Sequence, residues 1–499
     1  MRCLKYSFEL VLAVLIVLFA LIFSGGESHA EALPLEEKVA SDQKKPNFWP
    51  RARWSEDWST IGDTTPFLEA ESQFFEQYLH FIKYIPLGDD EETYLSLGGE
   101  ARLAFESYSD KDFGMSDIGS QDALQLRLAV NVDVHFNKDW RLFTQLGYGA
   151  ASDRQGGQKA GDDSNPNIWE LFLDRSFPIG DQERTVVRLG RQIIESGGMF
   201  LNAGEGNNVR QVYDAIRIGW LDESFAMFEA FGGEFVDFAD DAFEMAGTGE
   251  YLWGGNAGFR LPQSDVNLSL MYVGWSLKDR QFDQGGGGRH KDERHTFLLR
   301  AAKPLVGHRQ WGVDYSLAYQ TGEYDDQSGG STILAYAAYG EVKYAFLAED
   351  DTPFIGLKTA YFSGDDDPND NSLNTFYAPL FGTPFFGYAR DIQPSNLIYL
   401  QPNAGYRFGN TAILTLTHGF YWRASTEDGY YGSPNSRTAS GDVSDSSWLG
   451  QQTQLGVRYM VNNGVLVSSY LAHFFAGDYM KDAGGGDRDY FHLGIHYLF

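Results

Sequence analysis

The chain has 499 residues and a formal net charge of −30 at pH 7, with 69 acidic and 39 basic side chains. So acidic a chain argues against nucleic acid as a partner, because binding to nucleic acid depends on neutralising phosphates with Lys and Arg. Its 28 Tyr, 37 Phe and 56 Gly are typical of many strands and turns. The single cysteine, Cys3, excludes intramolecular disulfides.

The first thirty residues have the features of a secretory signal peptide. Arg2 and Lys5 precede an uncharged run over 10–23, and Ala30 ends a small-x-small pattern that a signal peptidase reads. As a helix the run would be about 21 Å long, which is short of the roughly 30 Å of a bilayer core. We therefore expect residues 1–30 to be cleaved rather than to anchor the chain in a membrane.

Residues 31–93 show no alternation of apolar and polar side chains. They begin with a polar tail that carries Lys and Glu, and they contain RWSEDW at 53–58 and KYIPLG at 83–88. We expect an N-terminal periplasmic extension that folds partly back into the domain that follows it.

From Tyr94 onward, apolar side chains alternate with polar or small ones, which is the period of a strand with two different faces. In the stretch 124–136 the even positions are Leu, Val and Phe, and the odd positions include Arg127 and Asp133. A helix would scatter these apolar residues around its axis. The last segment, which ends at Phe499, repeats the pattern.

We count 18 such segments over 94–499, joined by short and long connections in turn. The segments begin near residues 94, 123, 140, 167, 185, 210, 224, 250, 266, 293, 311, 332, 352, 396, 411, 448, 465 and 488. This predicts an all-β fold, a transmembrane antiparallel β-barrel of about 18 strands with short periplasmic turns and long extracellular loops. A soluble propeller or solenoid would repeat a motif at a fixed period, and the sequence shows no such repeat.

The predicted location is the outer membrane of a Gram-negative bacterium, where the barrel would contact lipid and lipopolysaccharide. The terminal aromatic Phe499 on an alternating strand fits the signal that the outer-membrane assembly machinery reads. That machinery is therefore an expected partner.

The second face of the segments would line a lumen, and cations outnumber acids on it. On the segments with the clearest alternation the inward cations are Arg102, Arg127, Arg141, Arg294, Arg300, Lys343, Lys358, Arg407, Arg423 and Arg458. The inward acids are Glu100, Glu106, Asp133, Asp314 and Glu341. A ring of Arg and Lys discriminates in favour of anions, and the Arg fork binds both oxygens of a carboxylate. The alternative is that these residues pair across strands and brace the wall.

Several motifs resemble those of the bacterial alginate export proteins of the outer membrane, over roughly residues 51–499. Beside RWSEDW and KYIPLG, they are LSLGGEARL at 95–103, LGRQ at 189–192, NVRQVYDAIRI at 208–218, ERH at 293–295, SGDDDPND at 363–370 and FYWRASTEDGYYG at 420–432. The resemblance implies an 18-stranded barrel with an arginine-rich constriction that passes a polyuronate outward. It also implies that Arg102, Arg191, Arg210 and Arg423 line the pore, and for Arg191 and Arg210 the facing rests on the resemblance alone.

The predicted function is a channel that exports an anionic polysaccharide, an alginate-like polyuronate. The predicted pore lining is Arg102, Arg127, Arg191, Arg210, Arg294, Arg300, Lys358, Arg407, Arg423 and Arg458. One alternative is a porin for the uptake of small anions, whose lumen would carry the same charge. Another is a barrel enzyme acting on lipid or glycan, which would need a Ser and His, or paired carboxylates, at one rim. An exporter would also meet periplasmic secretion proteins.

No cofactor is expected, since no HExxH or GxSxG motif occurs. Asp365 and Asp367 have the spacing of the first ligands of a calcium loop, but Asp370 stands where that loop needs Gly and Phe376 where it needs Glu. A calcium ion there is the one metal that the sequence suggests.

An 18-stranded barrel is wide enough to leak, so we expect a segment inside it. The candidates are the connection 363–395 and the extension 31–93. The connection is favoured because its acidic start, SGDDDPND, would sit against the cationic lumen in place of the anionic polymer. A solvated surface loop is the alternative.

Overall fold

The computed structural model describes most of the chain from residue 82 onward. The described residues are 82, 85–89, 92–115, 118–152, 154, 161–179, 183–202, 207–222, 226–238, 245–261, 266–278, 291–303, 310–326, 329–347, 351–368, 370–409, 411–432, 437–462 and 464–499. The predicted signal peptide and nearly all of the predicted N-terminal extension lie outside these residues.

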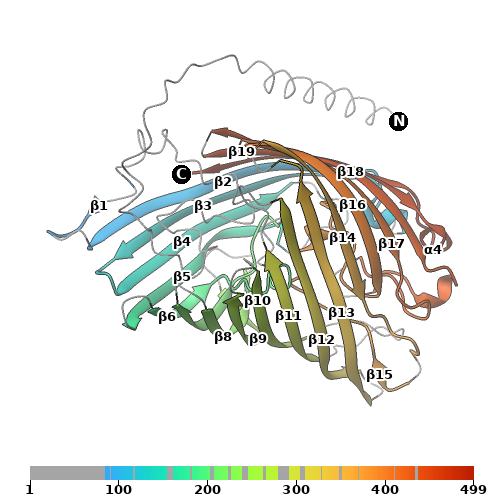
Figure 1. Ribbon diagram of the computed structural model, residues 1–499, viewed down its shortest axis with the longest axis horizontal. Coiled ribbons are helices and arrows are strands. Elements are labelled where there is room, and N and C mark those ends of the chain that lie inside the picture. Colours follow the sequence, from blue (N-terminus) through green and yellow to red (C-terminus); the bar gives the residue numbers. More distant parts are fainter. Residues whose placement is uncertain are drawn as a thin grey trace, which may run out of the picture. The chain divides into compact units, whose positions relative to one another are not determined.

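Eighteen of the described strands form a closed antiparallel β-barrel (Figure 1). Each strand pairs with the next along the chain, and the last strand, β20, pairs with the first long strand, β2, which closes the ring. β14 pairs directly with β16, because β15 is a two-residue strand within the connection between them and pairs in parallel with β13. The two-residue β1 pairs with the start of β2.

The wall strands are 10 to 17 residues long. The first half of the chain contains β1 (Ile85–Pro86), β2 (Tyr94–Tyr108), β3 (Gln121–His135), β4 (Trp140–Ala151), β5 (Ser164–Ile179), β6 (Glu183–Gln192), β7 (Tyr213–Asp222), β8 (Ala226–Phe238), β9 (Met245–Arg260) and β10 (Asn267–Leu277). The second half contains β11 (Lys291–Lys303), β12 (Trp311–Asp326), β13 (Gly329–Ala345), β14 (Thr352–Phe362), β15 (Ser372–Leu373), β16 (Leu397–Phe408), β17 (Ala412–Trp422), β18 (Trp448–Asn462), β19 (Val465–Ala476) and β20 (Arg488–Leu498).

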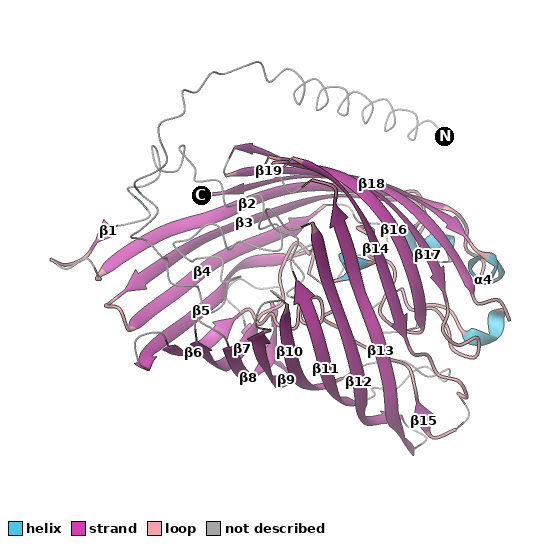
Figure 2. Ribbon diagram, in the orientation of Figure 1, coloured by secondary structure: helices cyan, strands magenta, loops and turns pink. Residues whose placement is uncertain are grey.

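The helical elements are short and lie in the connections (Figure 2). They are η3 (Lys111–Gly114), η4 (Thr383–Phe385), η5 (Gly441–Val443) and α4 (Asp478–Asp482). None of the described helices is long and apolar enough to cross a membrane.

The predicted fold is confirmed strand by strand. Each of the 18 wall strands begins within five residues of its predicted start, and the largest difference is at β9, predicted at 250 and observed at Met245. Gly247 and Gly249 interrupt the alternation there, so the sequence pattern does not reveal the first five residues of the strand. The connections alternate between short and long ones from β2 to β8 and from β13 onward, as the sequence predicts. The alternation fails between them: the β8–β9 connection, 239–244, is no longer than the next one, 261–266, and the β12–β13 connection, 327–328, has two residues where a long one was expected.

The wall is apolar on its outer face and polar on its inner face. On β3, Leu124, Leu128 and Val130 are 43 to 54% exposed, whereas Arg127 and Asn131 between them are at most 3% exposed. This is the reverse of a soluble protein, in which Leu and Val are buried and Arg is exposed. It is typical of strands whose outer face contacts lipid.

Aromatic side chains mark both ends of this outer face. Trp140, Trp311 and Phe346 are 38 to 55% exposed beside the short turns. At the long-loop end, Trp422 and Trp448 lie 5.1 Å apart between ring centres. Two such girdles are typical of the two membrane–water interfaces of an outer-membrane barrel.

The outer face yields a first prediction, at Leu128. This residue lies halfway along β3, so Leu128→Arg would place a charge near the bilayer centre and lower the free energy of unfolding in phospholipid vesicles by about 2–4 kcal/mol. The matched control is Asp122→Arg, at the end of the same exposed face, with an expected change of at most about 1 kcal/mol. Equal losses at the two positions would contradict the assignment of this face to lipid.

Candidate functional site

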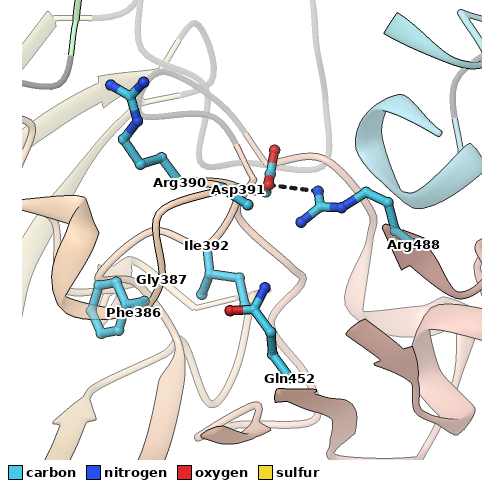
Figure 3. Close-up of a pocket in the computed structure, with 8 residues that line it drawn as sticks. Phe386, Gly387, Arg390, Asp391, Ile392, Gln452 and Arg488 are labelled. Atoms are coloured by element: carbon cyan, nitrogen blue, oxygen red, sulfur yellow. Dashed lines mark ion pairs between the residues drawn. The ribbon is translucent and has the colours of Figure 1, made fainter. Parts of the chain in front are cut away.

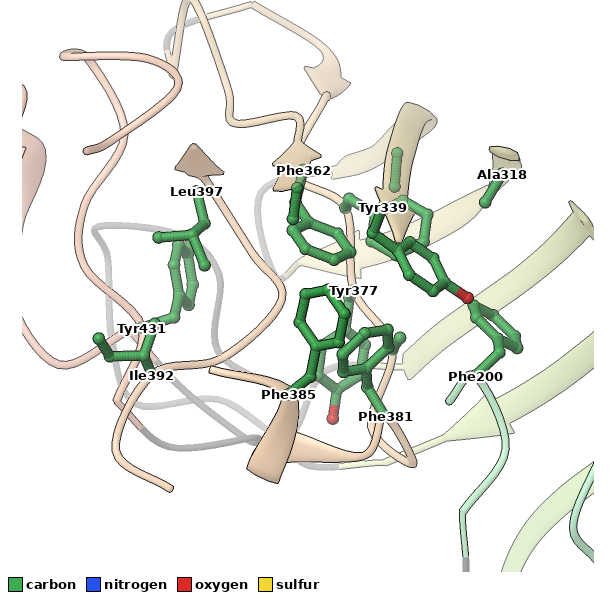
Figure 4. Close-up of a cluster of buried hydrophobic side chains, with 14 of the residues drawn as sticks. Phe200, Ala318, Tyr339, Phe362, Tyr377, Phe381, Phe385, Ile392, Leu397 and Tyr431 are labelled. Atoms are coloured by element: carbon green, nitrogen blue, oxygen red, sulfur yellow. The ribbon is translucent and has the colours of Figure 1, made fainter. Parts of the chain in front are cut away.

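The connection between β14 and β16, residues 363–396 and here called L7, lies inside the lumen. Its side chains Phe376, Phe381 and Phe386 are 0 to 5% exposed. They pack against inward-facing aromatic residues of the wall, with Phe381 edge-on to Tyr339 at 4.9 Å between ring centres. Figure 4 shows Phe381 beneath the wall residues Tyr339 and Phe362. L7 therefore forms much of a hydrophobic core within the barrel.

Polar side chains of the wall also hold the backbone of L7. Six of them donate hydrogen bonds to its carbonyl oxygens: Arg294 to Thr375 (2.8 Å), Gln320 to Tyr377 (2.9 Å), Lys358 to Phe385 (3.3 Å), Tyr399 to Phe385 (3.4 Å), Tyr421 to Phe386 (2.6 Å) and Tyr108 to Ala389 (3.2 Å). These donors come from β11, β12, β14, β16, β17 and β2, so L7 is attached around more than half of the wall. The segment expected to close the barrel is a packed plug and not a solvated surface loop.

The reason expected for this placement was wrong. Asp366 and Asp367, in the acidic start of L7, are exposed. L7 contacts the wall through its aromatic residues, through its carbonyl oxygens and through two ion pairs, Arg390 with Glu106 of β2 at 3.0 Å and Asp391 with Arg488 of β20 at 2.5 Å. Asp391 lies outside the acidic start of L7, so SGDDDPND is not the part of the plug that meets the wall cations.

A second connection enters the lumen, and the sequence did not predict it. It joins β6 to β7, comprises residues 193–202 and 207–212, and is here called L3. The Asn208 side chain donates to the carbonyl oxygens of Leu126 (2.8 Å) and Ala150 (3.1 Å). The motif NVRQVYDAIRI was the available signal, but its apolar residues continue the alternation of the strands and led us to begin a strand at 210.

L3 and L7 meet across the lumen. The amide of Asn202 donates to the carbonyl oxygen of Leu380, and the amide of Gly382 donates to that of Met199, both at 2.8 Å. Arg390 Nη1 of L7 donates to Asn207 Oδ1 of L3 at 2.9 Å. The two connections together obstruct the barrel, and their line of contact is the natural place for an opening.

A small pocket lies between L7 and the wall beside this line. Phe386, Gly387, Arg390 and Gln452 contribute to its lining, as Figure 3 shows. On one side Asp391 pairs with Arg488 of β20 at 2.5 Å. Gly387 has a φ of +143°, and a side chain there would collide with Gln452, so glycine permits the close approach of L7 to β18.

The inner face of β3 to β8 is electrically balanced among the side chains described. Its cations are Arg127, Arg141, Arg188 and Arg217, and its acids are Asp133, Glu170, Asp174 and Glu229. Direct pairs join Arg141 to Asp133 (2.8 Å), Arg188 to Asp174 (2.7 Å) and Arg217 to Glu229 (2.5 Å). On these strands the inward charges pair with one another across the sheet and brace the wall, which was the alternative to a ring of free cations.

The inner face of β11 to β18 has an excess of cations. Over the described side chains its cations are Arg294, Arg300, Lys343, Lys358, Arg407 and Arg458, and its acids are Asp292, Asp314 and Glu341. We call this face the cationic sector. The lumen is thus asymmetric, and its charge excess is smaller than predicted because acids on β5, β8 and β11 were missed.

Three of the predicted pore residues converge on L3. Arg127 and Arg210 both pair with Glu100, at 3.5 and 2.6 Å. Arg102 Nη1 donates to the carbonyl oxygen of Asn207 at 3.2 Å. These residues attach L3 to β2 and β3.

Five others belong to the cationic sector. Arg294 is fully buried against Asp292 at 2.7 Å and holds L7, as Lys358 also does. Arg300 pairs with Asp314 at 2.6 Å and remains 26% exposed. Arg407 and Arg458 face inward near the short-turn ends of β16 and β18.

Two of the predicted pore residues need correction. Arg191 lies on the outer face, because its neighbours Leu189, Leu171 and Asp214 on that face are 42 to 61% exposed, and it pairs with Asp214 at 2.8 Å. Arg423 is 1% exposed. It lies one residue beyond β17, where strand alternation no longer sets its direction.

Arg423 is enclosed by the connection between β17 and β18, residues 423–432 and 437–447, here called L8. Its guanidinium donates to carbonyl oxygens within L8, including that of Asp428 at 2.8 Å and that of Thr426 at 2.9 Å. The ring of Tyr479 lies 4.0 Å below it. Arg423 therefore organises L8 and presents no charge to the lumen.

Comparison with known proteins gives both a family and a fold. The family model described as alginate export matches residues 93–493. The chain belongs to the alginate export family. No curated protein matches this family member. With its closed barrel, it is an outer-membrane channel of a Gram-negative bacterium, as the sequence predicts.

Solved structures share the fold of this alginate export family channel. A BenF-like porin from Pseudomonas fluorescens Pf-5 has a TM-score of 0.54 at 12% identity, over 81% of this chain and 98% of that one. OccK9 (OpdG) of Pseudomonas aeruginosa has a TM-score of 0.53 at 12% identity over the same shares. OccK2 (OpdF) of the same organism, in complex with glucuronate, has a TM-score of 0.52 at 12% identity over 81% and 96%.

L8 of this family member also clasps L7. Asn396 at the end of L7 donates to the carbonyl oxygens of Ser425 (3.0 Å) and Gly429 (2.9 Å). At the start of L7, the amide of Asp365 donates to the Asp428 carboxylate at 3.0 Å. Thr375 donates to the same oxygen of Asp428 at 2.6 Å.

Two carboxyl groups therefore lie close together in the clasp. Burial and the neighbouring Asp428 raise the pKa of the Asp365 carboxyl to about 6, and burial raises that of Asp428. No group of three metal-binding side chains occurs among the described residues. Calcium at Asp365 and Asp367 stays a prediction, and the first carboxyl is buried whereas the second is exposed.

The clasp predicts a pH dependence of opening. Because the pKa of Asp365 is raised in the closed state, its stabilising contribution is complete in acid and is lost as the pH rises through about 6. Open probability in planar bilayers should therefore increase from pH 5 to pH 7.5. Asp365→Asn should abolish the increase and keep the channel as closed as at pH 5, whereas Asp366→Asn, at an exposed neighbour, should retain it. An unchanged pH profile in Asp365→Asn would contradict this account.

Proposed function

We propose that this channel carries an anionic polysaccharide, an alginate-like polyuronate, out of the cell along the cationic sector, and that it has no catalytic role. The proposal combines membership of the alginate export family with the charge of the lumen. The one observation that carries it is the location of the charge excess on β11 to β18, opposite a balanced wall. A low-dielectric wall focuses such a field and raises the local concentration of anions.

The geometry of the sector suits a repeating carboxylate. Arg300 and Lys343 are 26 and 37% exposed, so they remain accessible although each has an acidic neighbour. Gln401 and Asn403 of β16 face the same side but are buried, and Asn403 donates to Glu341 at 3.2 Å. A polymer of uronates would therefore meet the accessible cations first.

Passage requires an opening in the plug, and we infer that it forms where L3 meets L7. This contact comprises backbone hydrogen bonds at Met199 and Leu380 and the Arg390–Asn207 bond. L7 is attached to the wall by many more contacts than join it to L3. The line between the two connections is therefore the weaker boundary.

The parts of the chain outside the barrel fit the same proposal. We infer that residues 1–30 are removed during export, and that residues 31–93 face the periplasm and contact secretion proteins there. The barrel itself would be inserted by the assembly machinery of the outer membrane. OccK2, with the same fold, was solved with glucuronate, and a monomeric uronate is the substrate expected if the channel serves uptake instead.

Ion selectivity tests the proposal. In planar bilayers, replacing Arg407 and Arg458 together by Gln should lower the anion-to-cation permeability ratio by roughly twofold or more. The control is Arg175→Gln, which removes a charge from the outer face, where Arg175 stacks on Trp140, and should leave selectivity unchanged. A channel that prefers cations before any mutation, or one equally affected by both changes, would refute the proposed role of the cationic sector.

A further inference from the structure

We propose that Phe113, in the connection between β2 and β3, is a latch on the plug that keeps Arg488 of β20 against Asp391 of L7. Withdrawal of Phe113 from its site would release the part of L7 that meets L3, and the channel would open. The connection, here called L1, is described over residues 109–115 and 118–120. The inference concerns how the closed state is held, and it is independent of the solute that the channel carries.

The backbone of L1 is strained where it carries Phe113. Among the described residues, only four other than glycine have a positive φ, and all four lie in L1 or L7: Asp112, Phe113, Arg390 and Asn396. Phe113 has a φ of +59° and a ψ of +23°. Asp adopts this left-handed conformation fairly often, but for a bulky residue such as Phe it is an outlier. Contacts of Phe113 must therefore hold it there.

Those contacts involve Arg488 and the connections around it. Phe113 is 1% exposed, and the Arg488 guanidinium lies 4.2 Å from the centre of its ring. Phe474 of β19 packs on the same ring, with 4.6 Å between centres. The amide of Gly486, in the connection between β19 and β20, donates to the carbonyl oxygen of Phe113 at 2.7 Å. One stacked cation, one aromatic contact and one backbone bond thus hold the strained residue.

Arg488 in turn holds L7. Its Nη1 lies 2.5 Å from Asp391 Oδ2, and Figure 3 shows this ion pair. Lys111 of L1 approaches the other oxygen of the same carboxylate, at 3.9 Å. Asp391 directly follows Arg390, whose side chain donates to Asn207 of L3 at 2.9 Å. L1 therefore acts, through Asp391, on the contact between L7 and L3.

The pair of Arg488 and Asp391 is poorly bonded for its burial. The two residues are 2 and 7% exposed. Within the described part of the chain, Arg488 Nε and Nη1 and Asp391 Oδ2 have no partner with hydrogen-bond geometry. The pocket between L7 and the wall, which both residues line, leaves space for them to separate. A buried ion pair of imperfect geometry adds little stability, so this one depends on the Phe113 ring, which excludes water from one side.

The latch gives the channel a way to open from outside. L1 is one of the long connections, so it lies at the extracellular end of the barrel. When Phe113 leaves, water reaches Arg488 and the ion pair weakens, because the local dielectric rises. Asp391 then moves together with Arg390, and the link between L7 and L3 breaks. Strain in L1 favours this withdrawal, whereas the stacking of Phe113 on Arg488 opposes it.

The test is the open probability of single channels in planar bilayers. Phe113→Ala should raise it by about tenfold or more, because it removes one desolvated cation–π contact. Asp391→Asn should raise it as well, because it removes the ion pair. The matched control is Met115→Ala, which shortens another side chain of L1 that packs against the same hydrophobic core and should change the open probability by less than about twofold.

Combining the first two changes distinguishes a latch from a connection that only packs on the wall. If Phe113 acts through Arg488 on Asp391, then Phe113→Ala should alter the open probability by less than about twofold in a channel that already carries Asp391→Asn. Independent effects would multiply, and that result would overturn the latch. An open probability of Phe113→Ala equal to that of the unmodified channel would overturn it too.

A gel of unheated samples shows whether each variant assembles. If Phe113→Ala does not, Phe113→Leu takes its place, since it keeps an apolar side chain and removes only the aromatic face. It should raise the open probability by about threefold or more, and an unchanged value would overturn the latch. The anion preference of the open channel should be the same in each Phe113 variant as in the unmodified channel. A changed preference would place Phe113 in the conduction path and contradict its role as a latch.

Discussion

Pairing between β2 and β20 closes the sheet, and the other features of the molecule follow from that closure. A closed ring leaves no strand edge unpaired, so the wall can stand in lipid with every backbone group satisfied. A ring of eighteen strands is too wide for its own side chains to fill. The chain fills it instead with L7 and L3, which carry aromatic residues such as Phe381 and Phe200 into the interior.

The charged side chains inside the barrel fall into two groups: paired charges on β3 to β8, and an excess of cations on β11 to β18. On β3 to β8 the arginines are paired at short range, as Arg188 is with Asp174. Such pairs brace the wall, because a buried guanidinium without a partner would be strongly destabilising. The inner face of the cationic sector carries six cations and three acids among its described side chains. That excess is consistent with a lumen that attracts anions.

Strand positions were predictable from the sequence because lipid imposes a strict period of two on the outer face. The position of L7 inside the barrel was also predictable, since so long a connection without strands of its own is uncommon unless it has a function. The predicted facing was wrong at two positions. The facing of Arg191 came from the resemblance, whereas Leu189 and Arg191 keep the period of two on the outer face of β6. Arg423 lies just past the end of β17, where alternation no longer applies. The entry of L3 into the lumen was not predicted, because Val209 and Val212 continue the apolar alternation of a strand. Only their burial in the structure shows that they lie inside the barrel.

The central claim is that the channel opens where L3 meets L7, and a reversible cross-link tests it most directly. Cys3 is the only cysteine of the chain, so Met199→Cys with Gly382→Cys would place a single disulfide across the contact at which their backbones already bond at 2.8 Å. Single-channel conductance should remain at the closed level when the pair is oxidised and should recover on reduction. The same conductance in both redox states would contradict the account.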